Sequence, residues 1–276
     1  MKPAPFAYRR PGSLEEALEA LAGEANAKVL AGGQSLVPLL SMRLAAPALL
    51  VDINGLPDLA AIAADATGVR IGALARHADV LASPDVRRVQ PLVPLALAHV
   101  AHATIRNRGT TVGSIVHADA AAEMPVVLRV LGGSVEAASV RGRRTIPAEE
   151  LFLGPLESSL AHDEVAVSAH VPALPVGAGV AFDEIARRHG DYALVGAAAL
   201  VDGDTVRVGY LSVNDVPTVV DLGGVPLEDV GEAALAHLEP VGDIHATAAY
   251  RAQLVRVLTE RVVRAAYAMA GQEGPA

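Results

Sequence analysis

Two successive glycines stand between a short apolar segment and a helical pattern near the N-terminus. The segment Ala31-Gly32-Gly33-Gln34-Ser35-Leu36 leaves a predicted strand at 28–31 and opens a predicted helix at 36–44. Glycines allow a ligand to approach the backbone closely, and the N-terminus of a helix favours negative charge. The spacing therefore suits a pyrophosphate, although an ordinary tight turn with Ser35 as helix N-cap explains it at least as well.

A polar segment interrupts the apolar chain at residues 104–114. It contains hydroxyl groups, arginines, glycines and one amide, at Thr104, Arg106, Asn107, Arg108, Gly109, Thr110, Thr111, Gly113 and Ser114. If buried, these polar groups need partners, which a phosphate or a polyol chain would supply. A solvated loop remains the alternative.

Three ionisable side chains follow this segment, at His117, Asp119 and Glu123. Asp119 precedes a predicted helix at 121–131 and is expected to be its N-cap. His117 and Asp119 could begin a metal site, but no third ligand stands at a recognisable spacing, so no metal is expected. Arg76-His77 is expected to be a solvated helix start.

The sequence lacks the motifs that usually carry catalysis by side chains. It contains no G-x-S-x-G elbow, no H-E-x-x-H pair and no P-loop, and the glycine turn at 32–33 is not a G-x-G-x-x-G fingerprint. It also contains no cysteine, which excludes disulfides, thiolate catalysis and an iron–sulfur cluster held by this chain. If the protein is an enzyme, a cofactor is expected to supply the chemistry, with no catalytic side chain of its own.

The composition indicates a globular protein of about two domains. The 276 residues are 52% hydrophobic and 19% charged, enough apolar material for a sizeable core. The formal net charge of −9 argues against a nucleic-acid binder. No apolar run approaches the roughly 18 residues of a membrane span, and no secretory signal is visible, so a cytoplasmic location is expected.

Periodicity and turn residues predict an α+β protein with three units. The first, at 1–55, is a βαβ-like unit with the glycine turn in its middle. The second, at 56–175, combines hairpins at 60–73 and 134–146 with helices at 86–103 and 121–131, a strand at 164–171, and a loop without clear periodicity at 106–119. A Pro/Gly-rich segment at 172–177 precedes the third unit, 178–276. In that unit we expect a three-stranded antiparallel sheet (180–185, 193–201 and 205–213), then helices at 227–238 and 245–270.

Together the motifs resemble the FAD-binding medium subunits of the molybdenum hydroxylases, the group of carbon monoxide dehydrogenase and xanthine dehydrogenase. The resemblance runs in order through segments 6–18, 31–38, 42–44, 51–54, 105–114, 117–125 and 187–193. It implies two α/β subdomains that hold FAD between them and a C-terminal α+β domain.

The resemblance also implies which residues hold the cofactor. FAD would contact a first loop (Ala31, Gly32, Gly33, Gln34, Ser35, Leu36) and a second loop (Asn107, Thr110, Thr111, Gly113, Ser114). Asp119 and Glu123 would lie near the ribityl or ribose part. Tyr192 would lie near the isoalloxazine, or would otherwise be a core aromatic. The absence of cysteine excludes a cysteine-linked flavin. A histidine link is conceivable in this wider group, but the loops resemble the branch that binds FAD non-covalently.

One residue departs from the family pattern. The second loop usually carries Gly-Thr-Ile-Gly-Gly-Ser or -Asn, whereas here Val112 replaces one glycine. A β-branched residue is strained at positive φ. We therefore expect Val112 to keep a negative φ with its side chain in apolar surroundings beside Ile115, and the N–H groups of Thr111, Gly113 and Ser114 to face the ligand.

The family resemblance implies an electron-transfer subunit. A large partner would carry the molybdenum cofactor, a small partner two [2Fe–2S] clusters, and the assembly would be a dimer of heterotrimers. The FAD of this chain would pass electrons to an external acceptor. A stand-alone flavin-dependent oxidoreductase or monooxygenase, diverged from this family, is the alternative, and a binding protein that has lost FAD is a third.

Overall fold

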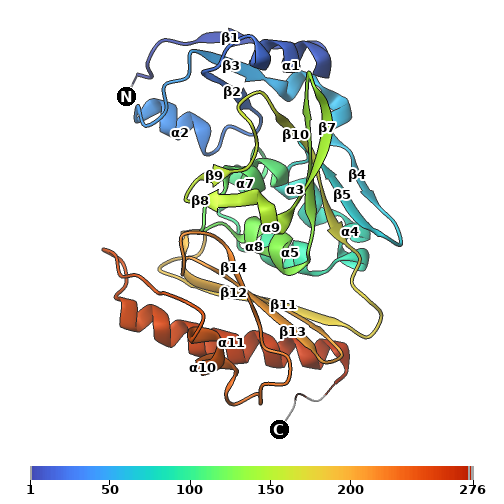
Figure 1. Cartoon of the computed structure of the whole chain (residues 1–276), viewed down its shortest axis with the longest axis vertical. Coiled ribbons are helices and arrows are strands. Elements are labelled where there is room, and N and C mark those ends of the chain that lie inside the picture. The colour runs from blue at the N-terminus through green and yellow to red at the C-terminus, as the bar shows by residue number, and fades with distance from the viewer. Residues whose placement is uncertain (1, 273, 275–276) are drawn as a thin grey trace.

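Three β-sheets follow one another along the long axis of the molecule (Figure 1). The computed structural model describes residues 2–272 and 274. The N-terminal sheet has the order β1-β3-β2, the middle sheet β4-β5-β10-β6-β7 and the C-terminal sheet β11-β12-β13-β14, and β8 and β9 form a separate pair. Helices are packed against each of the three larger sheets, as expected for an α+β protein.

The N-terminal sheet is parallel, so the ends of its strands deliver their following loops to one edge. β1 (Ala7–Arg9) and β2 (Ala27–Leu30) both pair in parallel with the central β3 (Leu49–Asp52). The helices are α1 (Leu14–Ala22) and α2 (Leu36–Ser41). The predicted βαβ unit is confirmed as β2–α2–β3, and β1 is an additional strand that the sequence did not predict.

The middle sheet is antiparallel between all its neighbours. Its strands are β4 (Ile62–Ala64), β5 (Gly68–Gly72), β6 (Ser134–Ser139), β7 (Gly142–Pro147) and β10 (Val165–Pro172). The helices are α3 (His77–Ala82), α4 (Pro84–Val89), α5 (Leu92–Leu97), α6 (Ala103–Arg106), α7 (Thr111–His117), α8 (Glu123–Val130) and α9 (Ala148–Leu151). Short 3-10 turns (Ile53–Gly55 and Pro57–Ala60) and the pair β8 (Phe152–Gly154) and β9 (Glu157–Ser158) complete this region.

One helix prediction and one loop prediction for this region were wrong. The segment 86–103 is not one helix, because Pro91 lacks an N–H group where α4 ends and Ala101 has a φ of 41°. The segment 106–119 is not all loop, since α7 begins at Thr111. The residues of α7 are weak helix formers, so the sequence did not indicate a helix. The cap at Thr110 stabilises α7, because the Thr110 side chain accepts a hydrogen bond from Gly113 N–H.

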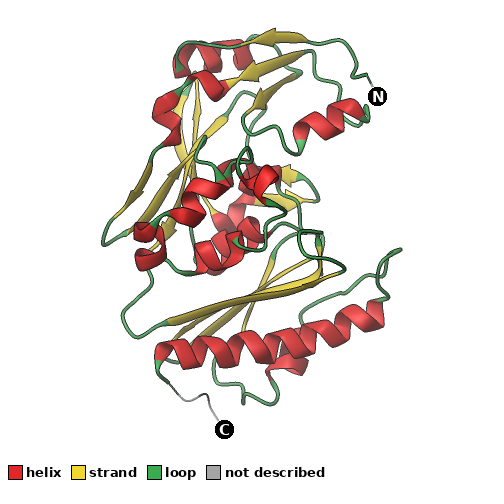
Figure 2. Ribbon diagram, turned by 180° about the vertical axis from the view of Figure 1, so that it is seen from behind, coloured by secondary structure: helices red, strands yellow, loops and turns green. Residues whose placement is uncertain are grey.

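The C-terminal sheet packs between the middle helices and one long helix (Figure 2). It contains β11 (Gly179–Ala186), β12 (Ala193–Asp202), β13 (Thr205–Leu211) and β14 (Thr218–Asp221), so the predicted three-stranded meander has a fourth strand. The short strand β14 lies among turn residues, so the sequence did not predict it. The helices are α10 (Val230–Leu235) and α11 (Ala248–Ala270).

Buried apolar clusters join neighbouring sheets. Leu74, Val165 and Val167 are packed into the cluster beneath the N-terminal sheet, and Val180 and Leu211 into the cluster of the middle region. The division at 1–55, 56–175 and 178–276 therefore stays a prediction. Among the described residues, no helix combines the length and apolar character needed to cross a bilayer.

The contact between β11 and α11 leaves no room for a side chain at Gly179. A Cβ there would lie 1.9 Å from the carbonyl oxygen of Ala266. We expect Gly179→Ala to lower the free energy of unfolding by about 1–3 kcal/mol, the usual effect of overpacking. Urea unfolding checks this. Gly12→Ala is the control, since its Cβ would make only an ordinary contact at 3.6 Å with Glu16; equal stability of the two variants would contradict the prediction.

Candidate functional site

The first glycine loop connects β2 to α2 and contains all six residues predicted from Ala31 to Leu36. Gly33 has a φ of +73°, so this turn requires glycine. The Gln34 amide nitrogen donates to the carbonyl oxygen of Gly32 at 3.2 Å. Ser35 is the N-cap of α2, as the simpler interpretation predicted, but its side chain makes no capping hydrogen bond.

The second glycine loop runs from the end of α6 into α7 and is closed by its own hydrogen bonds. Thr111 N–H donates to the carbonyl oxygen of Ala75 at 3.2 Å, Gly113 N–H to Thr110 Oγ1 at 3.2 Å and Ser114 N–H to the carbonyl oxygen of Thr110 at 3.0 Å. The expectation that these three N–H groups face a ligand was therefore wrong. Two of these N–H groups form bonds within the first turn of the short helix α7, and the third, of Thr111, bonds to Ala75 in the segment that follows β5.

Val112 meets the expectation set by its side chain. Its φ is not positive and it lies in α7. Its side chain is 1% exposed and belongs to the same apolar cluster as Ile115. Thr111 is also fully buried, with Oγ1 3.1 Å from Nδ1 of His77. Asn107, in contrast, is exposed at the end of α6.

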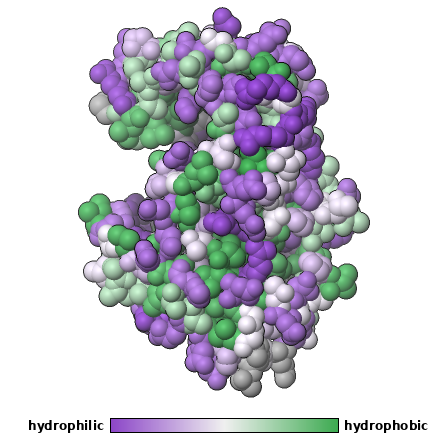
Figure 3. Space-filling model, viewed as in Figure 1, coloured by the Kyte–Doolittle hydropathy of each residue, from purple (hydrophilic) through white to green (hydrophobic). Residues whose placement is uncertain are grey.

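The two glycine loops are in direct contact. A Cβ on Gly32 would lie 2.6 Å from the carbonyl oxygen of Arg108, 2.8 Å from Cα of Gly109 and 3.0 Å from the nitrogen of Thr110. These distances leave no space for any side chain at Gly32. The space-filling view shows a hollow between the N-terminal region with α2 and the region of α7 and β8–β9 below it (Figure 3).

The solvated helix start expected at Arg76-His77 was wrong. His77 is 4% exposed, and burial, followed by the nearby charge of Arg106, lowers its pKa to about 4. Its backbone N–H donates to the carbonyl oxygen of Gly109 at 3.0 Å, and the bridge Arg76↔Thr110 joins the same segments. These residues support the second loop from beneath, a role with no local signal in the sequence.

An acidic cluster lies where the middle region meets the C-terminal sheet. Desolvation, followed by the negative charges of Asp119 and Glu123, raises the pKa of Tyr192, so these three predicted residues lie together. Tyr192 is 66% exposed, which excludes the alternative of a core aromatic. Asp119 is not the N-cap of α8, which is Ala122; instead its Oδ1 accepts a hydrogen bond from Ala121 N–H at 2.9 Å.

Sequence reasoning missed two members of this cluster. Glu184 on β11 lies with its Oε1 3.5 Å from Nδ1 of His99, and its Oε2 is buried without a hydrogen-bond partner among the described residues. Hydrogen bonding to Glu184, opposed by burial, raises the pKa of His99. Neither residue belongs to a recognisable motif, because strand β11 and the segment after α5 meet only in the folded chain.

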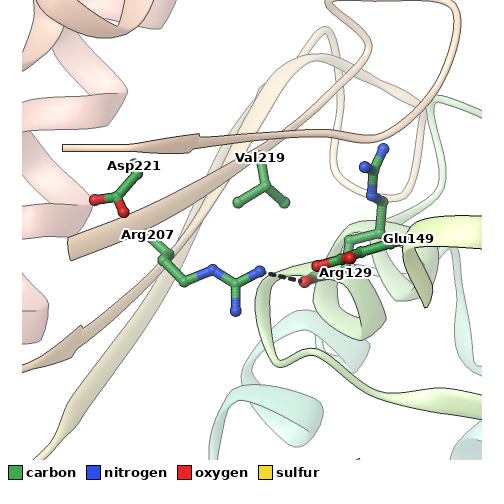
Figure 4. A pocket seen from close by; sticks show the side chains of 5 residues that line it. All are labelled: Arg129, Glu149, Arg207, Val219 and Asp221. Atoms are coloured by element: carbon green, nitrogen blue, oxygen red, sulfur yellow. Dashed lines mark hydrogen bonds between the residues drawn. The ribbon is translucent and has the colours of Figure 1, made fainter. Parts of the chain in front are cut away.

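A separate pocket lies between α8, α9 and the strands β13 and β14 (Figure 4). Its lining residues are Arg129, Glu149, Arg207, Val219 and Asp221. Arg207 donates to the carbonyl oxygen of Arg129 at 3.1 Å, and Arg129 donates to the carbonyl oxygen of Pro217. The two arginines thus bind backbone across the junction of the middle and C-terminal regions.

The buried carboxyl of Glu123 makes stability depend on pH. Burial, then the charge of Glu184, raises the pKa of Glu123 from 4.5 to about 8. The folded chain then holds a proton that the unfolded chain has lost, so the stabilisation is complete below about pH 4.5 and disappears as the pH rises through about 8. We expect Glu123→Gln to raise the melting temperature of the ligand-free chain more at pH 8.5 than at pH 5.

Thermal unfolding followed by circular dichroism at both pH values measures this difference. The exposed Glu239→Gln is the matched control and should shift little at either pH. An equal shift for Glu123→Gln at the two pH values would show that this carboxyl is not held protonated by the fold.

Comparisons with known proteins agree on one family. Residues 4–174 match the family described as the FAD binding domain in molybdopterin dehydrogenase. The chain is 42% identical to the 6-hydroxypseudooxynicotine dehydrogenase complex subunit alpha of Paenarthrobacter nicotinovorans, over 95% of each chain. It is 33% identical to the carbon monoxide dehydrogenase medium chain of Hydrogenophaga pseudoflava, over 97% of this chain and 99% of the relative.

Solved structures give the same result for the fold. A chain of quinoline 2-oxidoreductase from Pseudomonas putida 86 superposes with a TM-score of 0.89 at 36% identity, covering 98% of this chain and 100% of that one. A chain of carbon monoxide dehydrogenase from Hydrogenophaga pseudoflava also gives 0.89, at 32% identity, covering 98% and 99%. The family match, the relatives and the fold thus agree, and the chain belongs to the FAD-binding medium subunits of the molybdenum hydroxylases, an oxidoreductase family with FAD as its cofactor.

Proposed function

We propose that this chain carries electrons within a molybdenum hydroxylase complex. Electrons would arrive from two [2Fe–2S] clusters of a small partner subunit and leave through FAD to an external acceptor. A large partner subunit with the molybdenum cofactor would oxidise the substrate, in a dimer of heterotrimers. The observation that carries this proposal is the match to subunits of such dehydrogenases. In each comparison the match covers 95% or more of this chain and of the relative.

The absence of cysteine supports the need for partners. Iron–sulfur clusters are held mainly by cysteine thiolates, and the 276 residues contain none. This chain can therefore supply a flavin site but not the clusters that would feed it. The same absence excludes a cysteine-linked flavin, and we propose that FAD is bound non-covalently.

The glycine loops fit the diphosphate of FAD. Gly32 and Gly33 present backbone without side chains, and Ser35 leaves its hydroxyl free of any capping bond. An N–H-rich, side-chain-free turn is the kind of backbone that binds phosphate. The second loop, in which the N–H groups of Thr111, Gly113 and Ser114 are already bonded, would serve as the facing wall of the site.

The acidic cluster fits the flavin half of the molecule. FAD supplies the ability to accept and release electrons singly or in pairs. The exposed ring of Tyr192 offers a planar surface on which an isoalloxazine would stack. The carboxyls of Asp119 and Glu123 lie beside it and would accept hydrogen bonds from the hydroxyl groups of the ribityl chain.

Co-purification tests the proposed complex. We expect the tagged chain, expressed with the genes beside its own, to copurify with two partners and to contain FAD, iron and molybdenum. Acid precipitation should release the flavin into the supernatant. If the purified chain alone, loaded with FAD, oxidised an aldehyde or a purine at a normal rate, it would be a stand-alone enzyme instead.

Gly33 provides a test of the first loop. Its φ of +73° is strained for any other residue, and a Cβ would lie 3.2 Å from side-chain atoms of both Leu30 and Val37. We expect Gly33→Val to reshape the turn and weaken FAD binding at least about tenfold, because strain of this kind costs about 1–3 kcal/mol. Quenching of flavin fluorescence during titration of the FAD-free chain measures the dissociation constant.

A second glycine gives the matched control. Gly224 has nearly the same φ, +75°, but stands after β14 with no atom within 4 Å of a built Cβ. Gly224→Val should therefore carry the same backbone strain and keep normal FAD affinity. Equal affinities for the two variants would remove the first loop from the FAD site.

A further inference from the structure

One arginine side chain connects the two glycine loops through a pair of hydrogen bonds. Arg76 lies half-buried at the start of α3. Its Nη1 donates to the carbonyl oxygen of Arg108, in the second loop, at 2.6 Å. Its Nη2 donates to Oδ1 of Asn54 at 2.7 Å. The planar guanidinium therefore fixes two acceptors at a set separation.

Asn54 carries the connection onward to the first loop. Its Nδ2 donates to the carbonyl oxygen of Ala31 at 2.8 Å, and also to Oδ1 of Asp52 at 2.6 Å. Because Oδ1 of the amide accepts from Arg76 while Nδ2 donates to Ala31, the amide has a single suitable orientation. One continuous chain of hydrogen bonds thus joins Ala31 to Arg108.

The residues around Asp52 hold this chain in place. Asp52 Oδ1 accepts from the backbone N–H of Asn54 at 2.9 Å, and Oδ2 accepts from the Tyr8 hydroxyl at 2.5 Å. Burial alone would raise the pKa of Asp52, but the hydrogen bonds from Tyr8 and Asn54 lower it. Asp52 therefore remains an ionised acceptor that restrains Asn54.

The Arg76 side chain makes no other hydrogen bond within the described part of the chain. No carboxylate lies within 4 Å of its guanidinium there, so its two hydrogen bonds determine its position. The loops that it joins are the same two that leave no room for a Cβ on Gly32. A small change in their separation would therefore open or close that contact.

We propose that Arg76 and Asn54 form a clamp that holds the two glycine loops at the separation FAD binding requires. Arg76 acts in it as a positioning residue, through Arg108 on one side and Asn54 on the other. This inference rests on the FAD site of the proposed function but needs no partner subunit. It also assigns a role to Asn54, which follows β3 and would otherwise be an ordinary turn residue.

The clamp is tested by FAD titration of the full chain after removal of its flavin. Arg76→Lys keeps the charge but loses the planar fork, so we expect the dissociation constant for FAD to rise about tenfold. Asn54→Ala should weaken binding by a similar or larger factor. Because both residues act through one chain of bonds, the double variant should bind no more weakly than Asn54→Ala alone.

Arg88→Lys is the matched control, since Arg88 is exposed on α4 and pairs with Asp85. It should bind FAD as the unaltered chain does. Thermal unfolding of each FAD-free variant checks that the loss of affinity occurs in folded protein.

Unchanged FAD affinity in Arg76→Lys, or losses from the two substitutions that multiply in the double variant, would overturn the clamp. So would a loss of affinity that follows a fall in the folded fraction. Failure of the unaltered chain to bind FAD would overturn the proposed function as well, whereas normal binding by the unaltered chain and by Arg76→Lys would overturn the clamp alone.

Discussion

The structure depends on the close approach of two glycine loops from distant parts of the sequence. At Gly32 the backbone of residues 108–110 lies so near that a single methyl group would collide with three atoms. Interiors packed at this density resist continuous deformation. The parallel strands β2 and β3, the bridge at Arg76 and Thr110, and the buried His77 all hold the loops at this distance.

The parallel arrangement of the N-terminal sheet explains why Asn54 can reach the first loop. β2 and β3 run in the same direction, so the residues that follow both strands lie at one edge. Such edges are where ligands bind in α/β proteins. Because Asn54 directly follows the second strand of the predicted βαβ unit and Ala31 follows the first, parallel pairing of the two strands is enough to bring these residues together.

Much of the candidate site could be proposed from the sequence, because its glycines, hydroxyls and carboxylates occur in segments that resemble family motifs and are local in sequence. Arg76, His99 and Glu184 could not, since each acquires its role through partners more than 20 residues away. The break of the predicted helix at 86–103 and the hidden helix α7 have a similar cause. Pro91 interrupts a segment whose apolar periodicity favours one long helix, whereas Thr110 caps a helix in a segment with no clear periodicity.

The two loops differ in their capping and in their backbone conformation. In the second loop, Thr110 caps α7, and the N–H groups of Thr111, Gly113 and Ser114 are bonded within the protein, while Val112 turns its side chain into the core. In the first loop, the Ser35 side chain makes no capping hydrogen bond, and Gly33 keeps a conformation that other residues avoid. The position of Val112 tolerates a β-branched residue because its φ is not positive, whereas the φ of +73° at Gly33 excludes one. The departure at Val112 is therefore compatible with the proposed flavin site, because it falls in the loop that would form the facing wall.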